Sequence, residues 1–400
     1  MNVKLAIVTL AALASAACGA PSTPAEQRNA RARAATGDVL IGAAWPWKAR
    51  ANLLYAQGME MAVDEVNKAA GIRGRQMRII KVDDDETLDR GRAVAQQIAA
   101  NPDVVAVIGH LESFITVPAA AIYDLAGVLL VAPTSTDPAL TEQGYKLVFR
   151  TTFTDKQVGS HMAAVSLARG YRRIAIYYMR DRYGRSLANA FEETCRAGGS
   201  EVMDRQSYDP SEGANPRQID QLVASWKDRG LDAIFIAGEA PQAALVMAAA
   251  KRHGLTVPVL VGDALGTPEL FSSDPRAVDG VTLVSPFHPD EPRAEVRRFD
   301  SMFQARFAQR PDTAAALGYD AVRVLAEGMR KAPSTAPDDI AAALRATADW
   351  PGVTGTFAFS ASGDLRNHPL VTVAARNGRF VFVTSGQASP SAVARAGGGS

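Results

Sequence analysis

The sequence contains almost no cysteine, since Cys18 and Cys195 are the only two in 400 residues. Exported domains with small cores depend on several disulfides, and two cysteines, one of them a candidate for modification, cannot supply such a framework. Stability must therefore come from hydrophobic cores. About 350 residues lie between two polar ends, which is enough for two domains of ordinary size.

An excess of charge of one sign is also missing, with 43 Lys and Arg residues against 42 Asp and Glu residues. A nucleic acid or an anionic membrane surface is therefore not expected as a partner. Five scattered histidines and one free thiol offer no spacing for zinc. Phosphate-cradling glycine loops and the G-x-S-x-G elbow are absent. The sequence predicts no metal site, no cofactor and no enzyme activity.

Long apolar runs are missing as well. The run Leu5–Ala14 is shorter than the roughly 20 residues of a membrane span. With a preceding lysine and small residues after it, this run predicts a lipoprotein-type signal peptide over residues 1–18, in which Cys18 is the lipidation site. Ordinary signal-peptidase cleavage stays the alternative. Residues 19–36 and 387–400 lack apolar periodicity, so we expect a flexible tether and a disordered tail.

Strand-like and helix-like patterns alternate from Asp38 onward. Apolar residues recur at helical spacing, as in Met59, Ala62 and Val66, between short apolar runs that are typical of buried strands. This alternation predicts an α/β fold with parallel, doubly wound sheets. The pattern restarts after Val148–Thr152, which indicates a second lobe of the same kind.

Polar turns follow two consecutive predicted strands, Val104–Ile108 and Val128–Ala132. Each turn places hydroxyls where a helix is expected to begin, namely Ser113 in the first and Thr134, Ser135 and Thr136 in the second. Ligands of open α/β sheets bind at the carboxyl ends of strands, and free helix N–H groups attract anions. We therefore expect a small-anion site here. The alternative is that these hydroxyls only cap helices.

Several segments in a fixed order carry a family resemblance: AVDEVNKAAGIRGRQMRI, VIGHLES, IYDLAGVLLVAPTSTDPALTE, VFRTTFTDKQVG, RYGRSLANAFEE, ALGYDAVRVLAEGM and GTFAFSASGDL. Over residues 37–385 the chain resembles the type I periplasmic solute-binding proteins of ABC importers, and most of all the leucine/isoleucine/valine-binding group. The resemblance implies two lobes joined by a three-crossover hinge that bends around a ligand. The chain would cross near Thr152, Ser285 and Gly355. Lobe 1 would hold residues 37–152 and 286–354, and lobe 2 residues 153–285 and 355–386.

The resemblance also assigns ligand-binding roles. Lobe 1 would hold a ligand carboxylate through Ser113 and Thr136, with Thr134 offering its backbone. Lobe 2 would hold the ammonium and the far side of the ligand through Tyr183 and Asp263. Tyr183 could instead be a lobe-surface aromatic, and Asp263 a turn residue.

The chain departs from the family pattern at the ligand. Trp45 and Trp47 stand where the family has a small turn, so two indoles would wall the cleft, unless they pack against a neighbouring helix. Glu239 and Ala314 replace aromatic positions. Glu86 and Glu112 occupy positions that are disulfide-paired cysteines in the family's best-known members, and two such carboxylates must be protonated, bridged by a cation or turned apart.

Together these features predict an extracytoplasmic solute-binding component of an ABC importer. It would be exported to the periplasm or cell surface, lipid-anchored and monomeric, and it would deliver an amino acid or similar small zwitterion to a permease. The alternative is a ligand-sensing receptor subunit of the same fold, which signals on closure. Neighbouring genes for a permease and ATPase, or for a kinase, would separate the two.

Overall fold

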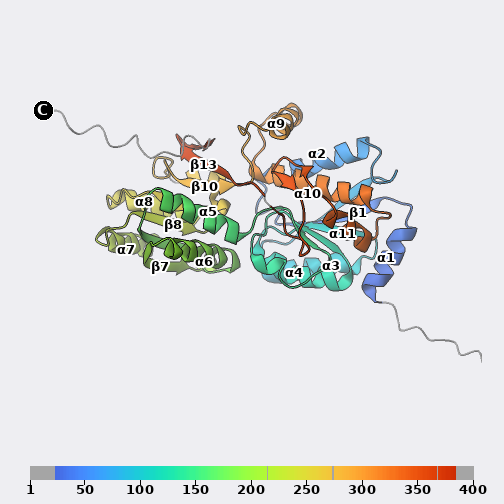
Figure 1. The fold of residues 1–400 in the computed structure, drawn as a ribbon, viewed down its shortest axis with the longest axis horizontal. Helices are drawn as coiled ribbons and strands as arrows, with labels where there is room; N and C mark the ends of the chain where they lie inside the picture. Colours follow the sequence, from blue (N-terminus) through green and yellow to red (C-terminus); the bar gives the residue numbers. More distant parts are fainter. Residues whose placement is uncertain (1–22, 214, 273, 367, 384–400) are drawn as a thin grey trace, which may run out of the picture.

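The computed structural model describes residues 23–213, 215–272, 274–366 and 368–383. The predicted signal peptide, Cys18 and the predicted disordered tail 387–400 lie outside these residues. Two α/β lobes lie side by side along the long axis of the molecule, with helices α1 to α4 in one lobe and α5 to α8 in the other (Figure 1).

The sheet of lobe 1 has five parallel strands in the order β2-β1-β3-β4-β5. Its middle strand β3 reads VVAVIG and is buried at every position, as a sheet covered on both faces requires. The strands are β1 (Val39–Trp45), β2 (Met77–Asp83), β3 (Val104–Gly109), β4 (Leu129–Ala132) and β5 (Val148–Arg150).

Helices cover both faces of this sheet. The helices α3 and α4 lie on one face, and α2, α10 and α11 on the other, where they share a core with α9 (Figure 1). Their bounds are α2 (Tyr55–Lys68), α3 (Leu88–Ala100), α4 (Ser113–Ala126), α9 (Ala294–Phe307), α10 (Thr313–Lys331) and α11 (Pro337–Arg345).

Lobe 2 contains a seven-stranded sheet in the order β14-β13-β10-β9-β8-β6-β7. Strands β6 to β10 are parallel, as predicted, whereas β13 and β14 are antiparallel additions at one edge. Helices α5 and α6 share one core with the sheet, and α7 and α8 share another. The bounds are α5 (Asp155–Ala168), β6 (Arg173–Met179), α6 (Arg182–Ala197), β7 (Glu201–Tyr208), α7 (Pro216–Lys227), β8 (Ala233–Ala237), α8 (Ala240–Arg252), β9 (Val259–Val261), β10 (Thr282–Ser285), β13 (Val371–Arg376) and β14 (Arg379–Phe382).

The third crossover lies further along the chain than the family resemblance implied. Residues after Gly355 form β12 (Thr356–Phe357), which pairs with β11 (Trp350–Pro351). Phe357 and Phe359 are buried in the core of lobe 1 rather than lobe 2. The chain reaches lobe 2 only with β13, so the assignment of residues 355–366 to lobe 2 was wrong. Apolar side chains at these positions could be buried in the core of either lobe. The sequence pattern alone therefore does not show to which lobe they belong.

The predicted flexible tether is wrong for residues 24–34, which form helix α1 (Pro24–Ala34). Thr23 and Glu26 build a capping box at its start. The buried Arg28 guanidinium anchors the helix by donating to four backbone carbonyls of lobe 1, those of Ala99, Asn101, Val104 and Ala126. Burial lowers the pKa of Arg28. The helix has little apolar periodicity because this polar side chain, rather than a hydrophobic stripe, attaches it.

Among the described residues, none of the helices combines the length and apolarity needed to cross a bilayer. Cys195 is a free thiol buried in lobe 2.

Candidate functional site

A cavity of about 370 Å³ lies between the lobes. Residues that follow β1, β3 and β4 line it from lobe 1, and residues that follow β6, β8 and β9 line it from lobe 2. In both sheets the chain order reverses beside the first strand of the lobe, at β1 and at β6. The cavity therefore lies where open α/β sheets bind ligands.

The predicted hydroxyls of Ser113, Thr134, Ser135 and Thr136 lie close together on the lobe 1 wall, but they do not all line the cavity. Ser113, the first residue of α4, lines the cavity and accepts a bond from Ser135 Oγ at 3.2 Å. Ser135 is fully buried and supports Ser113 instead of lining the cavity. Thr134 and Thr136 both line the cavity, but the Thr134 hydroxyl already donates to the carbonyls of His110 and Leu111. Ser113 and Thr136 are thus the hydroxyls available to a ligand.

The amino end of α4 lies beside these hydroxyls and has no side-chain cap, since the N-cap residue Glu112 makes no capping bond. Unpaired N–H groups and the positive end of the helix dipole favour a small anion there. The wall is suited to a carboxylate, as the sequence predicted.

A buried arginine that sequence analysis missed holds this wall in shape. Arg150, at the end of β5, is fully buried and donates to the carbonyls of Ser135 (2.8 Å) and Asp137 (2.9 Å). Its Nε donates to Asp364 at 2.7 Å. One guanidinium thereby fixes the polar turn after β4 and the segment that precedes the third crossover. No local sequence signal marks an arginine for burial.

On lobe 2, Tyr183 and Asp263 form a hydrogen-bonded pair that lines the cavity. The Tyr183 hydroxyl donates to Asp263 Oδ1 at 3.1 Å and accepts from the Ala264 N–H at 3.2 Å. Burial raises the pKa of Asp263 to about 6. The neighbouring Asp155 is fully buried, and its desolvation raises its pKa well above the usual value. Of the two carboxylates, Asp263 is the one that lines the cavity.

The two predicted indoles separate. Trp45 lines the cavity, and its ring stacks on Tyr55 with centroids 3.8 Å apart. Trp47 lies behind it, donates from Nε1 to the Val82 carbonyl at 3.1 Å and lines a different hollow on lobe 1. The expectation that both indoles wall the cleft is wrong for Trp47, because a half-buried backbone acceptor holds its polar edge away from the cavity. Ala314 lines the cavity where the family has an aromatic residue.

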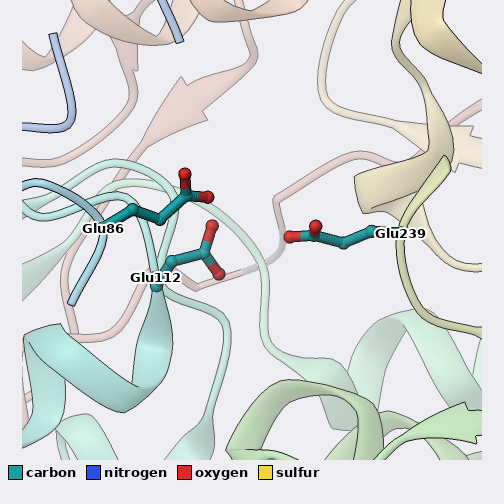
Figure 2. Close-up of side chains that lie close together, drawn as sticks. All are labelled: Glu86, Glu112 and Glu239. Atoms are coloured by element: carbon teal, nitrogen blue, oxygen red, sulfur yellow. The ribbon is translucent and has the colours of Figure 1, made fainter. Parts of the chain in front are cut away.

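Three glutamates converge on one arginine at the mouth of the cavity. Glu86 and Glu112 extend from lobe 1, and Glu239 extends toward them from lobe 2 (Figure 2). One carboxylate oxygen from each lies within 4.8 Å of the others. Arg50 Nη2 pairs closely with Glu86 and lies 3.2 Å from Glu239 and 3.9 Å from Glu112. Of the three arrangements open to Glu86 and Glu112, the structure has the one bridged by a cation.

The electrostatics of this cluster reflect crowding of like charges. Burial, followed by the charge of Glu239, raises the pKa of Glu112 well above the usual range, and burial also raises that of Glu239. Burial alone would lower the pKa of Arg50, but the surrounding carboxylates outweigh it and raise it. The oxygens are spaced closely enough to hold a metal ion, yet the guanidinium already occupies their centre.

Polar pairs also join the two lobes at the rim. Arg182 of α6 donates to Asp137 of lobe 1 at 3.1 Å, and Asn52 pairs with Glu269. With the pair formed by Arg50 and Glu239, these contacts hold the lobes together around the cavity.

Two α/β lobes that direct hydroxyls, a helix terminus and a carboxylate into one shared cavity define a two-lobe solute-binding protein. A family model described as periplasmic binding protein matches residues 49–379. The chain therefore belongs to the periplasmic binding protein family. It is a substrate-binding protein and not an enzyme. Members of this family are exported to the periplasm.

Individual relatives agree with this membership. The leucine-, isoleucine-, valine-, threonine- and alanine-binding protein of Pseudomonas aeruginosa is 30% identical over 313 residues, which cover 78% of this chain and 82% of the relative. The structure of an ABC transporter substrate-binding protein from Desulfitobacterium hafniense, in complex with Leu, is 37% identical with a TM-score of 0.78 over 86% of this chain and 100% of that one. A leucine-binding protein from Thermotoga maritima is 25% identical with a TM-score of 0.79, covering 86% and 98% of the two chains.

Proposed function

We propose that this protein captures an amino acid or similar small zwitterion in the interlobe cavity and delivers it to the permease of an ABC importer. The main support for this proposal is that one wall of the cavity favours an anion and the opposite wall favours a cation. An anion-binding wall on lobe 1, built by Ser113, Thr136 and the start of α4, faces the Asp263 carboxylate on lobe 2.

A zwitterion matches both walls at once. Its carboxylate would accept hydrogen bonds from the hydroxyls of Ser113 and Thr136 and from the N–H groups at the start of α4. Its ammonium would donate to Asp263, which Tyr183 orients through the 3.1 Å bond. A solute that carries only one of the two charges leaves one wall unpaired, which costs binding free energy.

The relatives support an amino acid as the ligand class. The Pseudomonas aeruginosa protein is named for five neutral amino acids, and the Desulfitobacterium hafniense structure contains Leu. Both proteins cover nearly the whole two-lobe part of this chain, so the same kind of cavity is available.

Ligand capture would close the lobes by hinge bending at the three crossovers. The rim pairs formed by Arg50 with Glu239 and by Arg182 with Asp137 already join the lobes in this structure, so they are contacts that opening of the cleft would break. Small-angle scattering should give a smaller radius of gyration with a bound amino acid than without it. An unchanged radius contradicts the hinge.

We further propose that Cys18 is acylated and anchors a monomeric protein to the membrane. The small residues before Cys18 and the apolar run before them support this. Durable anchoring needs more than one acyl chain, because a single chain holds weakly. Mass spectrometry of the mature amino terminus tests it, and an unmodified chain that begins elsewhere contradicts the anchor while leaving the export untouched.

The ligand class is tested by a thermal-shift screen with amino acids, amides, dicarboxylates and aromatic acids, followed by calorimetric titration of the hits. Thr136→Ala should weaken an amino-acid hit by about 1.5–3 kcal/mol, the range for a hydrogen bond to a charged group. Thr347→Ala is a matched control, since Thr347 is as deeply buried in lobe 1 but its hydroxyl donates to the Ala343 carbonyl outside the cavity. Unchanged affinity in a folded Thr136→Ala variant would leave Thr136 a purely structural turn residue.

A further inference from the structure

The interlobe cavity carries far more acid than base. Among the described residues that line it, Arg50 is the one basic side chain, against five acidic ones: Glu112, Glu239, Asp263, Glu269 and Asp312. Two of these acids have other roles. Asp312 caps α10 and accepts from the Ala315 N–H at 2.7 Å, and Asp263 is the partner proposed for the ligand's ammonium.

Arg50 does not satisfy the remaining carboxylates. The Arg50 Nε and Nη2 atoms both donate to Glu86, at the edge of the cavity. Two of the three guanidinium nitrogens are therefore already bonded to this one carboxylate. Glu239 receives longer bonds of 3.2 and 3.3 Å from the same Nη2. Glu112 lies 3.9 Å from that nitrogen, and in the described part of the chain no hydrogen bond reaches its carboxylate. One guanidinium therefore faces three carboxylates.

Three partly buried carboxylates thus share one guanidinium, and a second cation reaching them would balance the remaining negative charge. Glu112 and Glu239 come from opposite lobes and both line the cavity, so a second cation that reaches them from the cavity, beside Arg50, would contact both walls. Leu53 and Leu111 line the same cavity and offer apolar surface to a methylene chain.

We propose that the cleft selects amino acids whose side chain ends in a second positive charge, a primary amine or a guanidinium, and that Glu112 and Glu239 are the specificity residues that receive it. This inference rests on the proposed function, because it takes the α-carboxylate and α-ammonium to be held as described above. An acidic side chain would be repelled by the same carboxylates, and a branched apolar one would leave them unpaired.

The test is calorimetric titration of the mature protein with L-arginine, L-lysine, L-glutamine, L-leucine and L-glutamate. We expect arginine or lysine to bind at least about tenfold more tightly than glutamine or leucine, the effect of one hydrogen-bonded charge. Glu112→Gln and Glu239→Gln should each weaken the basic ligand by about 10- to 100-fold and leave leucine binding unchanged or stronger. Glu142→Gln and Glu193→Gln, at exposed glutamates of lobe 1 and lobe 2, are the matched controls.

The possible outcomes distinguish the proposed charge selectivity from the proposed amino-acid function. If leucine or glutamine binds as tightly as arginine and lysine, and Thr136→Ala weakens that binding, the amino-acid function stands and the charge selectivity is wrong. If no amino acid binds, both fall. Calcium binding that is lost in Glu112→Gln and is competitive with no amino acid would make the cluster a metal site and overturn the inference. Because the wild-type comparison needs no variant, a Gln variant that fails to fold does not remove the test.

Discussion

Replacing Asp263 by asparagine tests the ammonium-binding wall, because the change removes the charge while keeping the shape. The Tyr183 hydroxyl can still donate to the asparagine oxygen, as it does to Asp263 at 3.1 Å. The pKa of Asp263 is about 6, so most of the wild-type carboxylate is ionised at pH 7. Loss of a hydrogen bond to a charged group should then weaken an amino-acid ligand by about 1.5–3 kcal/mol.

The pH dependence follows from the same pKa. An ammonium needs the ionised carboxylate, so affinity should fall as the pH drops through 6, by about tenfold between pH 7 and pH 5. Amino acids themselves do not titrate at their α-groups in this range. Tyr183 and Asp155 face Asp263, and burial raises the pKa of each above its usual value. Glu112 and Glu239 have raised pKa values elsewhere in the cavity, so the variant must be compared with the wild type at every pH.

The same change should stabilise the ligand-free protein. A pKa raised in the folded state means that ionisation of Asp263 opposes folding, and stability is lost as the pH rises from about 4 to 6. Asp263→Asn removes this cost at pH 7, which is on the order of 1–3 kcal/mol. Calorimetric titration from pH 5 to pH 8 and a thermal melt together form the assay. A variant that binds as tightly as the wild type, with the same pH profile, refutes the assignment of Asp263 to the ammonium.

Three further changes test other parts of the structure. Arg150→Leu should lower the free energy of unfolding by about 3 kcal/mol, because it removes the donor to two buried carbonyls and the ion-pair partner of the half-buried Asp364. Urea denaturation measures this, and a loss below about 0.5 kcal/mol would contradict the clamp. Trp45→Phe should remove most of the fluorescence change on ligand binding, whereas Trp47→Phe should retain it, and the reverse result would restore Trp47 to the cleft. Arg28→Ala should increase hydrogen exchange in α1 and leave the rest of lobe 1 protected, and equal exchange would show that α1 needs no anchor.

Local patterning predicted the parallel sheets of both lobes and the hydroxyls at the strand ends. Fully buried strands such as β3 and β8 follow from unbroken apolar runs, and Ser113 and Thr136 follow from polar residues at strand ends. These features depend on neighbours in the sequence, so periodicity and turn chemistry reveal them. Asp263 and Tyr183 needed the family resemblance, because nothing local pairs a helix residue with a turn 80 positions away.

The missed features are long-range polar contacts. Nothing in the local sequence distinguishes Arg150 or Arg50 from other arginines. Only the fold brings Asp364 to Arg150 and Glu239 to Arg50. The position of Trp47 likewise depends on a carbonyl of a different strand. Helix α1 is different, because the segment TPAE is a capping box with proline at the first helical position, which the sequence could have signalled.

A crystal structure of the protein with an amino acid that binds in solution tests the central claim most directly. The account predicts the ligand in the cavity between the lobes, with its carboxylate on Ser113, Thr136 and the start of α4 and its ammonium on Asp263. Density for the ligand on one lobe only, or outside the cavity, would contradict it.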